Sequence, residues 1–303
     1  MTAQAETVRV CAVQARLQFY GSAAEFRGHM SELMSRAAAY EPDLVVFPED
    51  VGTPLIALGD EELLGTCGTL REAIGAMTLR HAGPLAPIMG RWGCSPQRAL
   101  FLLKAAAMRE IYTETFADLA RRYRVTIAAG SILLSPAETD DGSVYNTMLL
   151  FGPAGAILGQ ADKVNLIPLE LADGLDICCG SPERLQALPT PLGRVGLLIC
   201  ADAWSPGLAA QLKEQGAQLL INCLANPEAW TDAVAADMAQ SLPARIAETA
   251  LPGVQAHGVG NLFELPFRGR SKIMAPEPGG GIRVVAQAKS VDEEEIVCGE
   301  LEL

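Results

Sequence analysis

A single thiol lies at the edge of an apolar run. Cys200 follows the stretch Val195–Ile199 and precedes a turn that opens into a helix. A thiol attacks as the thiolate, and at the ordinary cysteine pKa of about 8.5 little thiolate exists at neutral pH. A nucleophilic Cys200 therefore needs a base or a cation beside it. Without such partners, the same pattern indicates a cysteine that only fills the core.

Carboxylates occupy a comparable position elsewhere in the chain. Glu49 ends the apolar segment LVVFPE, in which Pro48 removes a backbone donor where strand pairing would stop. Partial burial there would raise the pKa of Glu49 toward the range of a general base. The alternative is that Glu49 or Asp50 only caps the following turn. Among the histidines, only His257 follows a strand-like run, so a Cys–His pair could form only between Cys200 and His257.

The segment ADKVNLIPLE, residues 161–170, supplies a candidate cation. Lys163 follows a strand-like stretch, and Glu170 closes the same segment. An ammonium group beside a thiol stabilises the thiolate, and it can also hold the oxyanion of a tetrahedral intermediate. The alternative interpretation of this lysine is a solvated surface charge.

Strand-like and helical segments alternate along the chain. Such alternation predicts an α/β architecture, with several apolar strands covered on both faces. No linker divides the chain, so we expect one domain over residues 1–303. Residues 51–110 form an insertion far longer than an ordinary connection, and we expect about two helices in it. Strands are expected at 8–14, 43–50, 125–133, 145–155, 194–200, 217–223, 254–260, 271–276, 282–289 and 295–303, and helices at 23–40, 112–123, 205–215 and 233–250.

The bulk composition limits the class of partner. The chain of 303 residues has a formal net charge of −13 and a pI of about 4.7, which argues against nucleic acid or an anionic membrane as partner. We find no secretory signal pattern and no stretch of the ~18–20 apolar residues that a membrane helix needs. We therefore expect a cytoplasmic protein whose eight cysteines are free thiols. The cysteines lack CxxC spacing, so we expect no zinc site.

Three segments together resemble a known pattern. DLVVFPED, KVNLIPLE and VGLLICADAW, in this order, resemble the signature segments of the nitrilase superfamily of carbon–nitrogen hydrolases, and within it the amidase-like branch. VRVCAVQARL resembles the first strand of that family, and FRGRSKIMAPEPG resembles its late F-x-G-x-S-x-I-x-x-P segment. The resemblance covers most of the chain apart from residues 51–110.

The resemblance implies a four-layer α-β-β-α sandwich that often pairs into a homodimer or a higher homo-oligomer. It implies Glu49 as general base, Lys163 as stabiliser of thiolate and oxyanion, and Cys200 as nucleophile. Glu170 resembles an additional glutamate that orients the lysine or the substrate, and the backbone N–H of Ala201 would be a second oxyanion donor. The implied reaction cleaves a non-peptide C–N bond of a small amide through a cysteine thioester, without metal or organic cofactor.

The sequence also departs from the family pattern. Asn165 stands where many members have a histidine, and we expect a structural role for this position. Ala201 and Asp202 follow the cysteine, whereas the nitrile-cleaving branch usually has Trp-Glu, so a true nitrilase is disfavoured. The segment ICADAW instead resembles that of glutaminase domains. A glutaminase or ω-amidase activity therefore remains open, alongside N-carbamoyl hydrolysis.

Other classes of protein also remain as alternatives. A catalytically silent or acyl-transferring relative would use the fold for binding or assembly, although the joint presence of Glu49, Lys163 and Cys200 argues against silence. An unrelated α/β protein would keep Cys200 as core filler. For residues 51–110 we expect a lid over the pocket or an oligomer contact.

Overall fold

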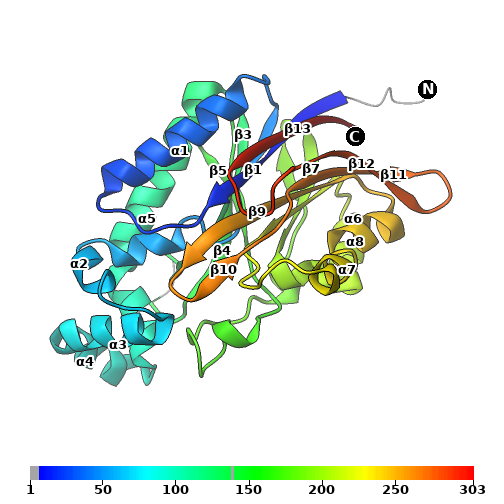
Figure 1. The fold of residues 1–303 in the computed structure, drawn as a ribbon. Coiled ribbons are helices and arrows are strands. Elements are labelled where there is room, and N and C mark those ends of the chain that lie inside the picture. Colours follow the sequence, from blue (N-terminus) through cyan, green and yellow to red (C-terminus); the bar gives the residue numbers. More distant parts are fainter. Residues whose placement is uncertain (1–6, 138–139) are drawn as a thin grey trace.

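Two β-sheets form the framework of the protein (Figure 1). The structure, a computed structural model, describes residues 7–137 and 140–303. In the first sheet three central strands run parallel, and each remaining strand is antiparallel to its neighbour. Its order is β13 (Glu295–Glu302), β1 (Thr7–Arg16), β2 (Leu44–Val46), β3 (Thr126–Leu134), β4 (Tyr145–Phe151) and β5 (Ile157–Asp162).

The second sheet repeats the arrangement of the first. Its three central strands β7, β8 and β9 also run parallel, and β9 pairs for two residues with β1, which joins the sheets. A short strand, β10 (Leu265–Phe267), folds back on β9. The order is β6 (Leu188–Thr190), β7 (Gly193–Ile199), β8 (Leu219–Leu224), β9 (Gly253–Leu262), β11 (Lys272–Glu277) and β12 (Gly281–Gln287).

Helices cover the outer face of each sheet, which gives four layers (Figure 1). The strand β1 shows why there are four layers. Its successive side chains point alternately into two different apolar cores, one on each face of the sheet. Val10 and Ala12 pack with residues of the second sheet, whereas Cys11 and Val13 pack under the helices of the first. The predicted α-β-β-α sandwich is confirmed. The covering helices are α1 (Ala23–Ala38) and α5 (Pro96–Tyr123) on the first sheet, and α6 (Pro206–Glu214) and α8 (Leu242–Thr249) on the second.

Some element boundaries differ from the sequence prediction. The strand predicted at 145–155 ends at Phe151, because a turn with Gly155 at a φ of 78° sends the chain back as β5. The helix predicted at 233–250 is two helices, α7 (Asp232–Met238) and α8. Pro243 explains the break, since proline is accepted in the first turn of a helix and not in its interior.

The insertion holds more helix than the sequence predicts. It contains η1 (Thr53–Ala57), α2 (Glu61–Leu64), α3 (Leu70–Arg80) and α4 (Ala82–Trp92), followed by the first half of α5. The helix predicted at 112–123 is thus only the second half of α5, because strong helix formers continue the pattern back to Pro96. These helices share a small apolar core of their own. Within the described ranges, no helix has both the length and the apolar character that crossing a membrane requires.

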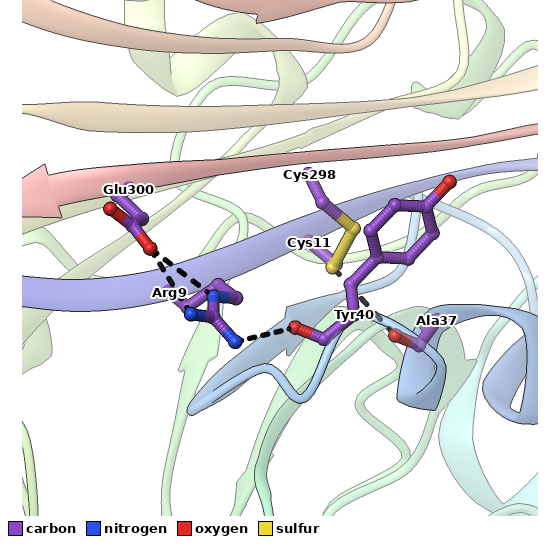
Figure 2. The surroundings of a disulfide bond; sticks show 6 residues. All are labelled: Arg9, Cys11, Ala37, Tyr40, Cys298 and Glu300. Atoms are coloured by element: carbon purple, nitrogen blue, oxygen red, sulfur yellow. Dashed lines mark hydrogen bonds and ion pairs between the residues drawn. A yellow bond between two sulfur atoms is a disulfide. The ribbon is translucent and has the colours of Figure 1, made fainter.

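Cys11 and Cys298 form a disulfide bond, so the prediction that all eight cysteines are free thiols is wrong for this pair. The two residues lie directly opposite each other on β1 and β13, with Cα atoms 4.2 Å apart. Figure 2 shows the bond close to the ion pair of Arg9 with Glu300, which joins the same two strands. The disulfide and the ion pair therefore tie the last strand to the first.

Candidate active site

The predicted site residues lie where strands end. Glu49 comes shortly after β2, Lys163 directly after β5 and Cys200 directly after β7. Cys200 has a φ of 46°, in the left-handed region that costs a residue with a Cβ atom about 1–2 kcal/mol. The turn from β7 into the 3₁₀ helix η4 (Cys200–Trp204) is therefore sharp, and it places the thiol at the rim of the sheet.

The structure brings Lys163 together with both predicted carboxylates. The ammonium Nζ lies 2.8 Å from Oε1 of Glu49 and 2.8 Å from Oε2 of Glu170. The side chains of Lys163, Glu49 and Glu170 are only 1%, 2% and 5% exposed. An ammonium group has three N–H donors, so one donor remains beyond these two contacts. The cation is thus enclosed by carboxylates and retains one N–H for a further acceptor.

Asn146, which sequence reasoning did not single out, connects the two carboxylates. Its Nδ2 donates to Oε1 of Glu49 at 2.9 Å and to Oε1 of Glu170 at 3.0 Å. The backbone N–H of Ala225 donates to Oε2 of Glu49 at 2.8 Å, and that of Ile167 to Oε2 of Glu170 at 2.9 Å. Both carboxylates are therefore fixed at each oxygen. The only signal in the sequence was an asparagine near the start of an apolar strand, which the structure buries fully.

Burial and mutual repulsion hold protons in the cluster. Burial raises the pKa of Glu49 despite the opposing charge of Lys163. Burial also raises the pKa of the Cys200 thiol. The charge of Glu49 and a hydrogen bond with the Glu49 side chain raise this pKa further. Burial alone would lower the pKa of Lys163, but the neighbouring acidic groups Cys200, Glu49 and Glu170 raise it well above its usual range. The site therefore combines a charged ammonium with a protonated thiol, and a proton passed from Cys200 to Glu49 leaves its net charge unchanged.

Asp202 connects the segment of Lys163 to the segment of Cys200. Its Oδ1 accepts the backbone N–H of Asn165 at 2.7 Å and of Val164 at 3.1 Å. Its Oδ2 accepts the backbone N–H of Ile199 at 3.2 Å. The Asn165 side chain also donates to Oδ1 of Asp202, at 3.2 Å, which gives this asparagine the structural contact expected for it. Burial raises the pKa of Asp202 to about 6.

A pocket opens above the thiol. Ala201, the predicted oxyanion donor, lines it beside Cys200. Among the described residues, none from 51–110 lines this pocket. That segment instead lines a neighbouring apolar cavity together with Phe263, Phe267 and Asp50. The pocket above the thiol is lined by Ile167, Cys200, Ala201, Trp204, Asn226, Glu228, Ala233, Val234, Asp237 and Met238.

His257 does not join this site. It is buried in β9, and its backbone N–H donates to Oγ of Ser271 at 2.9 Å. Its ring packs tightly against Gly269, and burial lowers its pKa to about 3, so the ring is neutral. Among the described residues, no hydrogen bond links the ring to Cys200. The Cys–His alternative therefore has no geometric basis.

Comparisons with known proteins agree with this geometry. The family model for carbon–nitrogen hydrolases matches residues 9–303. The chain is 30% identical over 140 residues to the deaminated glutathione amidase of Yersinia enterocolitica. The aligned region covers 42% of this chain and 48% of that protein. It is 28% identical over 127 residues to the human omega-amidase NIT2, covering 39% of this chain and 45% of the relative. The matches thus span about half the length of these relatives.

A solved structure resembles the whole fold. A mutant of the amidase from Nesterenkonia sp. AN1, which carries the acetamide moiety of fluoroacetamide on its active-site cysteine, superposes with a TM-score of 0.66 at 17% identity. The superposition covers 97% of this chain and 90% of that one. The family model spans nearly the entire chain, and the strand order and helical layers follow the predicted sandwich. The chain belongs to the carbon–nitrogen hydrolase family.

Proposed function

We propose that the protein hydrolyses the C–N bond of a small, non-peptide amide through a thioester on Cys200. The observation that carries this proposal is the buried cluster itself. One ammonium, two carboxylates and a thiol share a site that opens into a pocket. The amidase names of the relatives favour an amide as substrate over a nitrile.

The first half of the reaction forms the thioester and releases the amine. Glu49 takes the proton of the Cys200 thiol while the sulfur bonds to the carbonyl carbon of the amide. The negative charge that develops on the carbonyl oxygen is held by the remaining N–H of Lys163 and by the backbone N–H of Ala201. When the tetrahedral intermediate collapses, the C–N bond breaks and protonated Glu49 gives its proton to the departing amine.

The second half regenerates the enzyme. A water molecule attacks the thioester carbonyl while Glu49 accepts one of its protons. The C–S bond then breaks, and the proton returns from Glu49 to the sulfur of Cys200, so a carboxylic acid leaves. Glu49 takes part in every proton transfer, so no step adds a net charge to the buried cluster.

Glu170 and Asn146 act as positioning residues in this proposal. Glu170 holds Nζ of Lys163 at 2.8 Å, and Asn146 binds Oε1 of both Glu49 and Glu170. Together they aim the remaining N–H of Lys163 toward the oxyanion and keep Glu49 beside the thiol. Misplacement of such groups by about 1 Å can cost about a hundredfold in rate.

Turnover of a primary amide tests the proposal directly. Release of ammonia from hexanamide is measured for the wild type, for Cys200→Ala and for Cys179→Ala, whose exposed thiol makes it the matched control. We expect Cys200→Ala to lose activity by more than about a thousandfold, since a covalent nucleophile acts as one unit with its base. We expect Cys179→Ala to match the wild type. Undiminished hydrolysis by Cys200→Ala would overturn the proposal.

A further inference from the structure

Two carboxylates line the pocket above the thiol. Glu228 lies in the loop after β8 and Asp237 lies in α7, and both residues are exposed. Neither forms an ion pair with a residue in the described part of the chain. Their charges are therefore available to whatever enters the pocket.

The rest of the pocket supplies no positive charge to balance them. Among the described residues, no lysine, arginine or histidine lines it. Lys163 lies beyond the thiol, but its side chain is 1% exposed and is held between Glu49 and Glu170. The exposed side of the pocket therefore carries two carboxylates and no cation among the described lining residues.

One further lining residue suits a cationic ligand. Trp204 is half-buried, and the face of an indole ring attracts a cation. Asn226 also lines the pocket, but its Nδ2 is a donor and therefore does not pair with a cation.

We infer that the substrate is an amide whose acyl group ends in a positive charge, such as an ammonium or a guanidinium group. This inference rests on the proposed function and specifies its substrate class. The amide carbonyl lies against Cys200, and the cationic end lies near Glu228 and Asp237 with the ring of Trp204 beside it. An acyl group that ends in a carboxylate meets repulsion from the same two residues.

Three matched amides test this substrate class. Hexanamide, ω-aminovaleramide and the monoamide of adipic acid share one methylene spacer and end in a methyl, an ammonium and a carboxylate group. Exposed ion pairs contribute modestly, so we expect kcat/KM for the cationic amide to exceed that for the anionic amide by about tenfold. Added salt should reduce this ratio, because it screens exposed charges.

Variants of the two carboxylates assign the preference to the pocket. In the double variant Glu228→Gln with Asp237→Asn, we expect the cationic-to-anionic ratio to fall to about one, since each exposed pair is removed. Glu214→Gln, an exposed carboxylate outside the pocket, is the matched control and should retain the wild-type ratio. An equal or reversed order of the amides in the wild type would overturn the inference, as would a ratio that the double variant leaves unchanged.

The hydrolysis of hexanamide separates this inference from the proposed function. If all three amides are hydrolysed at equal rates and Cys200 is required in each case, the proposed function holds and the inferred substrate class is wrong. If none is hydrolysed, binding to Cys200→Ala by calorimetry decides the inference on its own. Tighter binding of ω-aminovaleramide than of the adipic monoamide supports it, and equal or weaker binding contradicts it.

Discussion

Two buried clusters in this protein use similar residues in opposite proportions. In the insertion, the carboxylate of Asp60 is fully buried and contacts two cations and a histidine: Arg80 Nε at 3.0 Å, Lys104 Nζ at 2.8 Å and His81 Nε2 at 2.9 Å. In the candidate active site, the single cation Lys163 contacts two carboxylates and lies beside a thiol. One cluster therefore has an excess of positive groups and the other an excess of acids.

The sign of the excess determines what each cluster can do. Burial alone would raise the pKa of Asp60, but hydrogen bonds from Lys104 and His81 outweigh it and lower the pKa. Asp60 therefore stays ionised and joins the helices of the insertion. In the candidate active site burial raises the pKa of both Glu49 and Cys200, and the charge of Glu170 raises both further. Those two groups can exchange a proton, which a permanently ionised carboxylate cannot do.

The largest expected effect comes from removing the cation of the active site. Lys163→Met leaves the oxyanion without its charged donor, so we expect kcat for hexanamide to fall by about a thousandfold. The remaining carboxylates lose their buried partner, which typically costs about 3–5 kcal/mol of unfolding free energy. Steady-state kinetics and urea denaturation measure both. Lys104→Met is the matched control, and a similar loss of turnover in that variant would contradict the contrast between the clusters.

A smaller effect is expected when the hydrogen bonds of Asp202, which connect the segment of Lys163 to the segment of Cys200, are disrupted. Asp202→Asn replaces an acceptor oxygen with an NH₂ group that faces backbone N–H donors. We expect kcat to fall by about a hundredfold while KM changes little, because the change misplaces Lys163 relative to Cys200. Asn165→Ala removes only one of the donors and should have a weaker effect. A variant with lowered thermal stability but unchanged kcat would restrict Asp202 to a structural role.

Replacing the carboxylate of Asp60 in the insertion should lower the stability of the protein without changing its turnover. Asp60→Asn leaves Arg80, His81 and Lys104 without their common carboxylate, and we expect a loss of about 2 kcal/mol of unfolding free energy, since all three side chains are partly exposed. Because Asp60 lies outside the pocket above Cys200, kcat/KM for hexanamide should be unchanged at a temperature where the variant is folded. A parallel loss of turnover would show that the insertion supports the chemistry.

A further effect concerns the pH dependence of stability. Burial raises the pKa of Asp50 from 3.8 to about 7, so between these values the folded protein binds a proton that the unfolded chain does not. Its contribution to the unfolding free energy is therefore lost as pH rises through this window. Asp50→Asn should gain stability over the wild type above the Asp50 pKa and little below 3.8. Thermal unfolding across pH, with exposed Glu62→Gln as control, measures the difference; a pH-independent gain would contradict it.

The layers of the fold could be predicted from the sequence, and so could the proximity of Glu49, Lys163 and Glu170, whose roles remain predictions. Glu49, Lys163 and Cys200 each follow an apolar strand, and the ends of such strands meet at one edge of a sheet. Asn146 could not be predicted in the same way, because its bonds to Glu49 and Glu170 depend on how the strands pack. Its sequence context shows only an asparagine near the start of a strand.

Long-range pairing explains the other failures. Cys11 and Cys298 are separated by 287 positions, and only the pairing of β1 with β13 places them opposite each other. The insertion contains more helix than predicted because its helices pack around a small apolar core of their own. The periodicity of the sequence alone does not show this packing, so it underestimates the helix content. The predicted cytoplasmic location, the single domain and the homo-oligomer remain predictions.

Identification of the acylated atom tests the central claim most directly. The wild-type protein is mixed with excess hexanamide, quenched in acid within one turnover and digested, and the peptide that contains Cys200 is analysed by mass spectrometry. We expect one hexanoyl group on Cys200, and no acyl group in Cys200→Ala or Lys163→Met treated in the same way. A hexanoyl group on another residue, or ammonia release by Cys200→Ala, would contradict the account.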